Sequence, residues 1–484
     1  MNVIAVFDVG KTNKKVFLFS ERYDIVWERT TSLPEITDED GDPCENLTRL
    51  TDWLHESMQE IMALPGFTIR AVNFSGYGAS LVYLDGDGKP VGHLYNYLKE
   101  FPDAVRNRFY EQYGPVDALL VQTASPALDS LNSGLMLYRI KYDKPDLFAR
   151  IQYALHLPQY LSYCLTGQVF SDLTSIGCHT MLWDFPQQRY HDWVGQEGLL
   201  PLLAPVHAAD QPVPVWLDNA PDSIPAGVGL HDSSAALIPY LASFQNEPPF
   251  VLISTGTWCI SLNPFNSEPL THEELQYDCL CYLTYRGEPV KASRLFAGHD
   301  HEQQIYRLAE HFNVPVDAYK RVHYDAELIR QLTPTAPPDN AVPTRMEPAH
   351  LLQPSRFGNR DLSRYATYDL AYHQLILDIM DQQVVSTALV LPGVDSPGEA
   401  SPGLDSSDAS TAAVSRICVD GGFSRNSIYM NLLAAAFPTM EVWAASVAQA
   451  TALGAALAIH DHWNLQPIPS TLISLTRYPS QPVP

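Results

Sequence analysis

Near its start, the chain combines a carboxylate, a glycine, lysines, a hydroxyl and an amide within eight residues. These residues are Asp8, Gly10, Lys11, Thr12, Asn13 and Lys15. A glycine in such a turn lets backbone amides approach a phosphate, lysines add positive charge, and a carboxylate can face a metal ion. The segment is not a P-loop, because Ala5 stands where that motif needs a glycine and we expect a strand to follow. It predicts a hairpin that either holds a phosphate or is an ordinary polar turn.

A second carboxylate follows a pair of glycines in the middle of the chain. Gly227 and Gly229 lead to His231 and Asp232, and helix-forming residues come next. We therefore expect Asp232 at the N-cap or in the first turn of a helix, where a capping carboxylate contributes about 1 kcal/mol. A carboxylate held in a site can instead act as a general base toward a hydroxyl group. The local sequence is compatible with both interpretations.

Two later turns could bind a nucleotide. Thr255, Gly256 and Thr257 follow a buried strand, and their hydroxyls and amides could hold a second side of a phosphate chain. Gly421 and Gly422 leave room for a flat ring to lie on the backbone. Phe423 and Asn426 follow them at the start of a helix. The alternatives are a simple turn at the first position and tight helix packing at the second.

Hydrophobic periodicity gives the elements that must position these residues. It predicts strands at 3–7, 16–19, 69–74, 81–84, 251–254 and 416–419, and helices at 46–63, 101–112, 133–166, 232–237, 366–391, 449–458 and from about 426. Strands that end in Asp, Ser or Thr beside Gly recur half a chain apart, which indicates a duplicated α/β architecture with a ligand between the halves. The Pro-, Gly- and Ser-rich segment 392–415 predicts a mobile surface insertion.

Composition excludes several classes of protein. The 484 residues carry 30 Lys and Arg against 55 Asp and Glu, a net charge of −25, so we expect neither nucleic-acid nor membrane-surface binding. The seven cysteines are scattered as in reduced proteins, and Cys279 and Cys281 lack the second pair of a zinc site. The chain start lacks the basic region of a signal peptide. These features predict a multidomain cytoplasmic protein.

Taken together and in order, the motifs resemble those of the FGGY carbohydrate kinases, within the actin-like ATPase superfamily. The matching segments are 8–15 for the first phosphate motif, 254–258 for the second, 421–422 for the adenosine motif, 229–236 for the segment with the family's catalytic Asp, and 157–175 for a first-domain pattern. The resemblance implies an α/β fold of two actin-like (ribonuclease H-like) domains, at 1–245 and 246–484, which flank a deep catalytic cleft.

The resemblance also implies roles for single residues, with ATP and Mg²⁺ as cofactors. Asp232 would be the general base, and Asp8 and Asp232 would lie on the metal side. The sugar would be bound by Tyr77, Gly78, Asn96, His231 and Asp232. ATP would be bound by Gly10, Lys11, Thr12, Asn13, Lys15, Thr255, Gly256, Thr257, Gly421, Gly422, Phe423 and Asn426. The expected protein is a monomer or homodimer that acts on a small sugar.

Within the family, the chain resembles the rhamnulokinase and fuculokinase branch, which implies a 6-deoxyketose such as L-rhamnulose or L-fuculose. Lys11 replaces the usual Thr or Ala, and residues 95–99 replace an aromatic-x-Asp segment that contacts the sugar in many members. Xylulose, ribulose, glycerol or another polyol therefore stays open as the acceptor. A non-kinase actin-like ATPase or sensor is a further alternative, although it would not need His231 and Asp232.

The general-base role of Asp232 leads to a first prediction. We expect Asp232→Asn to abolish sugar phosphorylation, because the amide cannot accept the hydroxyl proton, while ATP binding survives. Coupled ADP-release assays and a nucleotide-binding titration measure the two properties separately. Wild-type turnover in the variant would exclude this role.

Overall fold

The computed structural model describes residues 1–217, 222–245, 247–333, 346–392 and 414–480. The chain divides into two compact units. The first comprises Met1–Gln245, Cys281–Pro289 and Ala448–Leu472, and the second comprises Asn246–Leu280, Val290–Val447 and Ile473–Pro484. The predicted division into two functional domains at 245/246 stays a prediction. By its contacts, the segment 448–472 belongs to the first unit.

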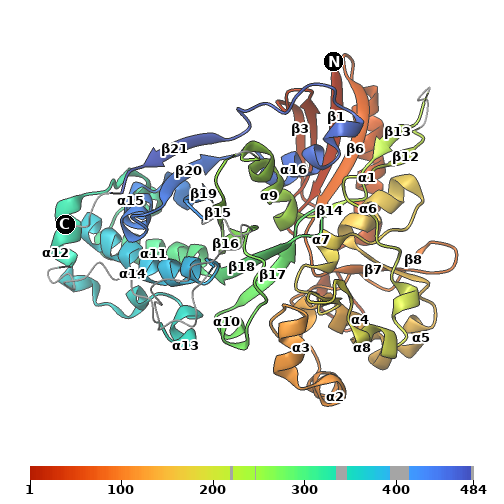
Figure 1. The fold of residues 1–484 in the computed structure, drawn as a ribbon, viewed down its shortest axis with the longest axis horizontal. Coiled ribbons are helices and arrows are strands. Elements are labelled where there is room, and N and C mark those ends of the chain that lie inside the picture. Colours follow the sequence, from red (N-terminus) through yellow and green to blue (C-terminus); the bar gives the residue numbers. More distant parts are fainter. Residues whose placement is uncertain (218–221, 246, 334–345, 393–413, 481–484) are drawn as a thin grey trace, which may run out of the picture. The chain divides into compact units, whose positions relative to one another are not determined.

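A seven-stranded mixed sheet forms the centre of the first unit, in the order β12-β13-β6-β1-β2-β3, with β14 also paired to β6 (Figure 1). Its strands are β1 (Asn2–Val9), β2 (Lys14–Ser20), β3 (Ile25–Thr31), β6 (Thr68–Gly76), β12 (Val213–Val215), β13 (Ile224–Ala226) and β14 (Leu230–His231). β1, β2 and β3 form an antiparallel meander, whereas β6 runs parallel to β1, β13 and β14. The parallel strands therefore end at one edge.

Helices cover both faces of this sheet. Alternate residues of β1, from Val3 to Val9, pack in one core with α1 (Leu47–Ala63) and α6 (Leu157–Thr166). Side chains alternate along a strand, so Asp8 lies on the opposite face. There α16 (Ala450–Ala458) packs against β1, β6 and α9 (Asp232–Ser243).

The rest of the first unit builds a second core around a small sheet, in the order β8-β7-β9. Its elements are β7 (Leu81–Leu84), β8 (Pro90–Val91), β9 (Tyr153–His156), α2 (Asp103–Tyr113), α3 (Val116–Gln122), α4 (Ser133–Asp143), α5 (Pro145–Phe148), α7 (Leu173–Ile176) and α8 (Asp192–Gln196). Two short strand pairs complete it: β4 (Ile36–Thr37) with β5 (Pro43–Cys44), and β10 (Trp183–Asp184) with β11 (Arg189–Tyr190).

Another seven-stranded sheet lies mainly in the second unit, in the order β17-β18-β16-β15-β19-β20-β21. The strands are β15 (Phe250–Thr255), β16 (Cys259–Asn263), β17 (Cys279–Leu283), β18 (Pro289–Leu295), β19 (Arg416–Gly421), β20 (Glu441–Ser446) and β21 (Ser474–Tyr478). The helices are α10 (His272–Gln276), α11 (Ala297–Phe312), α12 (Ala326–Leu332), α13 (Pro348–Leu351), α14 (Tyr368–Ala388) and α15 (Ser427–Ala436).

The two central sheets share one topology. In each, the first strand pairs antiparallel with the next and parallel with a later strand: β1 with β2 and β6, and β15 with β16 and β19. The predicted duplicated α/β architecture is therefore confirmed.

The segment 133–166, which is predicted to be helical, is helical only in part. The segment forms α4 and α5, then strand β9, and then α6. Pro145 and Pro158 stand in the first turns of α5 and α6, where a missing N–H is harmless, and proline disfavours helical backbone before it. Between them, β9 pairs with β7, from Leu84 opposite Tyr153 to Leu81 opposite His156.

The other predicted elements are found close to their expected positions. The predicted insertion at 392–415 lies almost entirely outside the described residues, which omit 393–413. Among the helices that are described, none is long and apolar enough to cross a membrane.

Candidate active site

The two candidate carboxylates lie at the carboxyl edge of the first unit's parallel strands. Asp8 of β1 is opposite Ser75 of β6, and Leu230 of β14 is opposite the same Ser75 on its other side. Asp232 follows β14 directly and is the first residue of α9. The sheet register therefore brings together two residues that are 224 positions apart in the sequence.

Asp8 is half-buried and is held by a hydroxyl group. The Thr451 Oγ1 donates a hydrogen bond of 3.0 Å to Asp8 Oδ2. Burial, and next the negative charge of Asp232, raise the pKa of Asp8 to about 6, while the Thr451 bond and the charge of Lys15 act in the opposite direction. The charge of Asp232 therefore disfavours ionisation of Asp8, as expected for two carboxylates that interact electrostatically.

Asp232 retains 33% of its side-chain exposure. Its Oδ1 accepts a hydrogen bond of 2.6 Å from the backbone N–H of Ser233 and lies 3.2 Å from His231 Nε2. Burial raises the pKa of Asp232 to about 6. A carboxylate with such a pKa is ionised at neutral pH, yet it is a stronger base than an ordinary aspartate. The predicted position in the first turn of a helix is confirmed, and this geometry suits a proton acceptor.

His231 is a buried, neutral neighbour of Asp232, because burial lowers its pKa to about 3. Its Nε2 also lies 3.1 Å from Cys178 Sγ, and its backbone N–H donates to Thr174 Oγ1 at 2.9 Å. Thr174 in turn is bonded to Asp172, the N-cap of α7. Sequence reasoning missed Cys178, because nothing in the local sequence links it to His231.

Gly78 is required by the packing around His231. A Cβ on Gly78 would lie 2.7 Å from Cys178 Sγ and 2.8 Å from His231 Nε2, both closer than real Cβ contacts. The predicted role of Gly78 is therefore compatible with a position beside His231.

Two tyrosines approach this region. The ring of Tyr77 packs edge-on against Tyr97, with centroids 6.0 Å apart. Burial, and then the charge of Asp232, raise the pKa of Tyr97. The Asn96 amide donates to the Pro43 carbonyl at 3.2 Å, so its sugar-binding role stays a prediction.

Lys99 has a structural role. Its ammonium group is buried and lies 2.5 Å from Asp38, 2.9 Å from Asp40 and 2.7 Å from Asp42. Three carboxylates therefore compensate the charge of Lys99 within the fold.

The predicted phosphate hairpin is a tight turn between β1 and β2. The Gly10 N–H donates to the Asn13 carbonyl at 3.0 Å, and the next element is a strand, which confirms that this is not a P-loop. Thr12 is exposed, and Lys11 forms a 2.9 Å ion pair with Glu35. Lys15 Nζ donates to Gln449 Oε1 at 3.1 Å, on the residue before α16.

In the second unit, the turns after β15 and β19 are joined by Thr255. Its Oγ1 donates to the Asp420 carbonyl at 2.5 Å and accepts from the Phe423 N–H at 3.0 Å. Gly421 has a φ of +88°, and a Cβ there would lie 1.8 Å from the Thr255 carbonyl oxygen. Only glycine fits this position. Thr257 is held in the neighbouring turn through its carbonyl, which accepts from the His299 N–H at 3.0 Å.

A cavity of about 560 Å³ opens beside these turns. It is lined by Gly256, Gly298, His301, Tyr319, Lys320, Val322, His323, Gly422, Phe423, Arg425 and Asn426. Four predicted nucleotide residues thus lie around one cavity. The cations Lys320 and Arg425 were missed: the segment around Lys320 carries no motif, and Arg425 stands within a predicted segment but was given no role. A nucleotide base could lie on Gly422, since a Cβ there would meet nothing within 4 Å.

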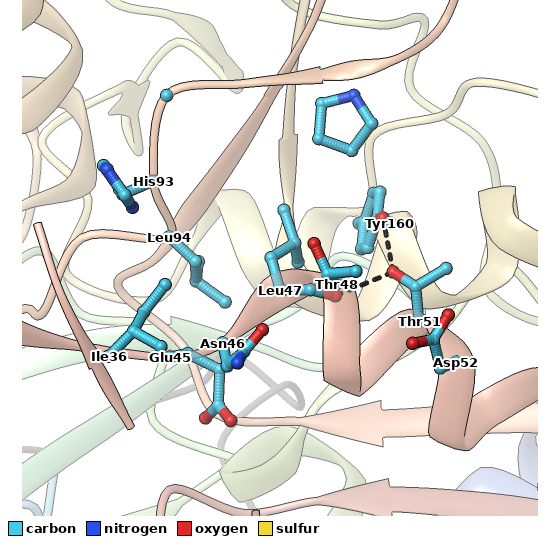
Figure 2. Close-up of a pocket in the computed structure, with 12 residues that line it drawn as sticks. Ile36, Glu45, Asn46, Leu47, Thr48, Thr51, Asp52, His93, Leu94 and Tyr160 are labelled. Atoms are coloured by element: carbon cyan, nitrogen blue, oxygen red, sulfur yellow. Dashed lines mark hydrogen bonds between the residues drawn. The ribbon is translucent and has the colours of Figure 1, made fainter. Parts of the chain in front are cut away.

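Another cavity, of about 360 Å³, lies in the first unit beside the start of α1 (Figure 2). Thr51 and Tyr160 line it and share a 2.7 Å hydrogen bond, which Figure 2 shows. Glu45 also lines it, and Glu45 Oε2 bonds Lys14 at 2.8 Å. The lining contains none of the predicted site residues, so this cavity is separate from the carboxylate pair.

The carboxylate pair can be tested as a magnesium site from its donor chemistry. Within the described part of the chain, no group of three or more His, Cys, Asp or Glu residues could hold a metal ion. Asp8 and Asp232 provide carboxylate oxygens as donors. Magnesium commonly binds one or two carboxylates and completes its shell with water and substrate phosphates. The pair therefore fits Mg²⁺ bound together with a phosphorylated ligand.

Comparison with known proteins places these features in context. Residues 3–197 match the model "FGGY family of carbohydrate kinases, N-terminal domain", and residues 247–340 match "Carbohydrate kinase FGGY, C-terminal domain". A rhamnulokinase of Yersinia pestis (strain Pestoides F) is 25% identical over 285 residues, which cover 56% of this chain and 56% of the relative. The chain thus spans about half the length of the curated relatives it matches.

Solved structures show the same fold. A carbohydrate kinase from Novosphingobium aromaticivorans has a TM-score of 0.78 at 22% identity and covers 99% of this chain and 94% of that chain. Plasmodium falciparum glycerol kinase with ADP has a TM-score of 0.69 at 15% identity and covers 95% and 90%. These likenesses establish an α/β fold shared with two-unit sugar kinases.

The raised pKa of Asp232 predicts an acid limit on any reaction that uses it as a base. Protonation below about pH 6 removes the base form, so we expect kcat/KM for sugar phosphorylation to fall about tenfold per pH unit below that value. The fall is steeper if Asp8 must also be ionised. ADP release measured against pH tests this, and a profile flat to pH 4.5, well below the pKa of about 6, would contradict it.

Proposed function

The chain belongs to the FGGY family of carbohydrate kinases, and on that premise we propose that it transfers the γ-phosphate of ATP to a primary hydroxyl of a ketose. The observation that carries the proposal is the pair Asp8 and Asp232 at one sheet edge, with the pKa of each raised to about 6. Such a pair supplies a proton acceptor beside a position for a metal–phosphate complex. A sensor or a non-kinase ATPase would not need the proton acceptor.

In the proposed reaction, Asp232 accepts the proton of the sugar hydroxyl. The hydroxyl oxygen then bonds to the γ-phosphorus, the bond from that phosphorus to the bridging oxygen breaks, and ADP leaves. Neutral His231 limits the movement of Asp232, because its Nε2 lies 3.2 Å from Oδ1. Tyr77, Gly78 and Asn96 complete the proposed sugar side.

The proposed nucleotide site uses the two glycine-containing turns of the second unit, after β15 and after β19. Gly256, Gly422, Phe423 and Asn426 line the 560 Å³ cavity, whose volume is in the range of small-molecule sites. Thr255 and Gly421 give its wall a fixed shape. Asn426 caps α15 by accepting from the N–H groups of Ile428 and Tyr429. The ADP in the glycerol kinase structure is in keeping with a nucleotide at a site of this fold.

Charge on the phosphates would be offset by few groups. Gly10 to Asn13 provide backbone amides, and Lys11 and Lys15 provide positive charge. When bound, Mg²⁺ would be held by Asp8 and Asp232 and would neutralise charge on the phosphate oxygens. The base, the cations and the metal together provide what phosphoryl transfer requires, since that reaction depends on positioning and charge neutralisation.

For the acceptor, we propose a 6-deoxyketose such as L-rhamnulose or L-fuculose. The support is the similarity to rhamnulokinases, at 25% identity. Xylulose, ribulose and glycerol are the alternative acceptors. The structural likeness to a glycerol kinase is the reason to include glycerol. We assign the sugar to residues 1–245 and ATP mainly to residues 246–484, in a cytoplasmic monomer or homodimer.

A coupled ADP-release assay tests the acceptor. The panel contains L-rhamnulose, L-fuculose, D-xylulose, L- and D-ribulose and glycerol, each with Mg-ATP. We expect the highest kcat/KM for one 6-deoxyketose. Preference for a pentulose or glycerol would refute the acceptor but keep the kinase, whereas ADP release that no acceptor changes would contradict the kinase itself.

A further inference from the structure

Helix α16 packs against the elements of the first unit that carry Asp8, Lys15 and Asp232. It comes from the far end of the chain, more than 440 residues after Asp8. The helix packs against β1, β6 and α9, and the residues at its start bond Asp8 and Lys15. The small residues of this segment predict only a helix suited to close packing.

The packing of α16 on α9 leaves no room for a side chain. A Cβ on Gly454 would lie 1.8 Å from the carbonyl oxygen of Ala235, in the first turn of α9. On the other side, the buried Asn73 of β6 donates from Nδ2 to the Ala455 carbonyl at 2.7 Å. These contacts fix α16 relative to the helix that begins at Asp232 and to the strand beside Asp8.

The two residues at the start of α16 then meet the charged groups. Thr451 Oγ1 donates to Asp8 Oδ2 at 3.0 Å, and Gln449 Oε1 accepts from Lys15 Nζ at 3.1 Å. A hydroxyl bond to one carboxylate oxygen restricts rotation of the carboxylate and leaves the other oxygen to face a ligand. Gln449 is the N-cap of α16 and has a left-handed φ of +54°, so the helical backbone begins at the next residue, Ala450.

We propose that Thr451 is a positioning residue for Asp8: its hydroxyl holds one carboxylate oxygen so that the other faces the metal–phosphate complex. This inference rests on the proposed function. The close contact between Gly454 and Ala235 holds α16 against the helix that begins at Asp232. The same helix α16 therefore sets both the orientation of the Asp8 carboxylate and the position of Asp232 relative to it.

Four variants of the full-length chain test the inference. Thr451→Val removes the hydroxyl at nearly constant volume, Thr451→Ala removes it without a branched side chain, and Thr451→Ser keeps it. Thr166→Val is the matched control: Thr166 is a half-buried helical threonine whose Oγ1 donates to the Ser162 carbonyl at 2.9 Å and accepts from the Gln168 N–H, and neither partner is a predicted site residue. Thermal melting selects the folded variants, and alanine replaces valine in the comparison if the valine variant is unfolded.

The first measurement is the kinetics of the variants with the preferred sugar. We expect Thr451→Val to lower kcat about tenfold and to raise the Mg²⁺ concentration for half-maximal rate, with the KM for sugar unchanged. Thr451→Ser should restore most of the turnover, and Thr166→Val should match wild type. Unchanged kcat in Thr451→Val, or an equal loss in the serine variant or in the control, would overturn the inference.

The second measurement does not depend on sugar turnover. Mn²⁺ replaces Mg²⁺, and electron paramagnetic resonance measures its binding to the protein with ADP. We expect about tenfold weaker binding in Thr451→Val and wild-type binding in Thr451→Ser. Equal binding in all variants would overturn the inference. If wild type phosphorylates no sugar, the proposed function fails, while this measurement still decides the role of Thr451.

Discussion

Asp8 and Asp232 repel each other at one edge of the first unit's sheet. The strand register and the hydrogen bonds to both carboxylates hold them in these positions. Asp8 is the last residue but one of β1, and Asp232 is the first residue of the helix after β14, so the parallel sheet brings the two carboxylates to one edge. Burial and mutual repulsion raise the pKa of Asp8 to about 6, so the pair is strained electrostatically when both are ionised. A bound cation would relieve that strain, which is the physical reason to expect a metal–phosphate complex beside them.

The same topology serves a different purpose in the second unit. There the strand equivalent to β1 ends at Thr255, whose hydroxyl bonds the Asp420 carbonyl and the Phe423 N–H. Gly421 beside it tolerates no side chain. One duplicated sheet edge thus presents carboxylates, and the other presents hydroxyls, glycines and a cavity of about 560 Å³. In the proposed reaction, the first edge would handle the proton and the second the nucleotide.

The places of the two carboxylates in their strand and helix could be predicted from sequence because those signals are local, whereas their roles rest on the family resemblance and stay predictions. The sequence signals for Asp8 and Asp232 consist of nearby glycines, Gly10 for the first and Gly227 and Gly229 for the second. The strands and helices around them follow from hydrophobic periodicity. Thr451 and Cys178 could not be found in this way, because each meets its partner only through the tertiary fold. The helical prediction for 133–166 does not hold at Tyr153–His156. These residues form strand β9, because pairing with β7 outweighs their local helical pattern.

The carboxyl pKa values of the pair test the account most directly. Carbon-13 NMR of protein labelled at the aspartate carboxyl carbons can follow Asp8 and Asp232, with Asp8→Asn and Asp232→Asn used for assignment. If Asp8 and Asp232 form one site, both carboxyl groups titrate near pH 6, and Asp232→Asn lowers the pKa of Asp8, because its negative neighbour is gone. If Asp8 titrated near the ordinary aspartate value of about 4 and did not respond to Asp232→Asn, the two carboxylates would not form one site.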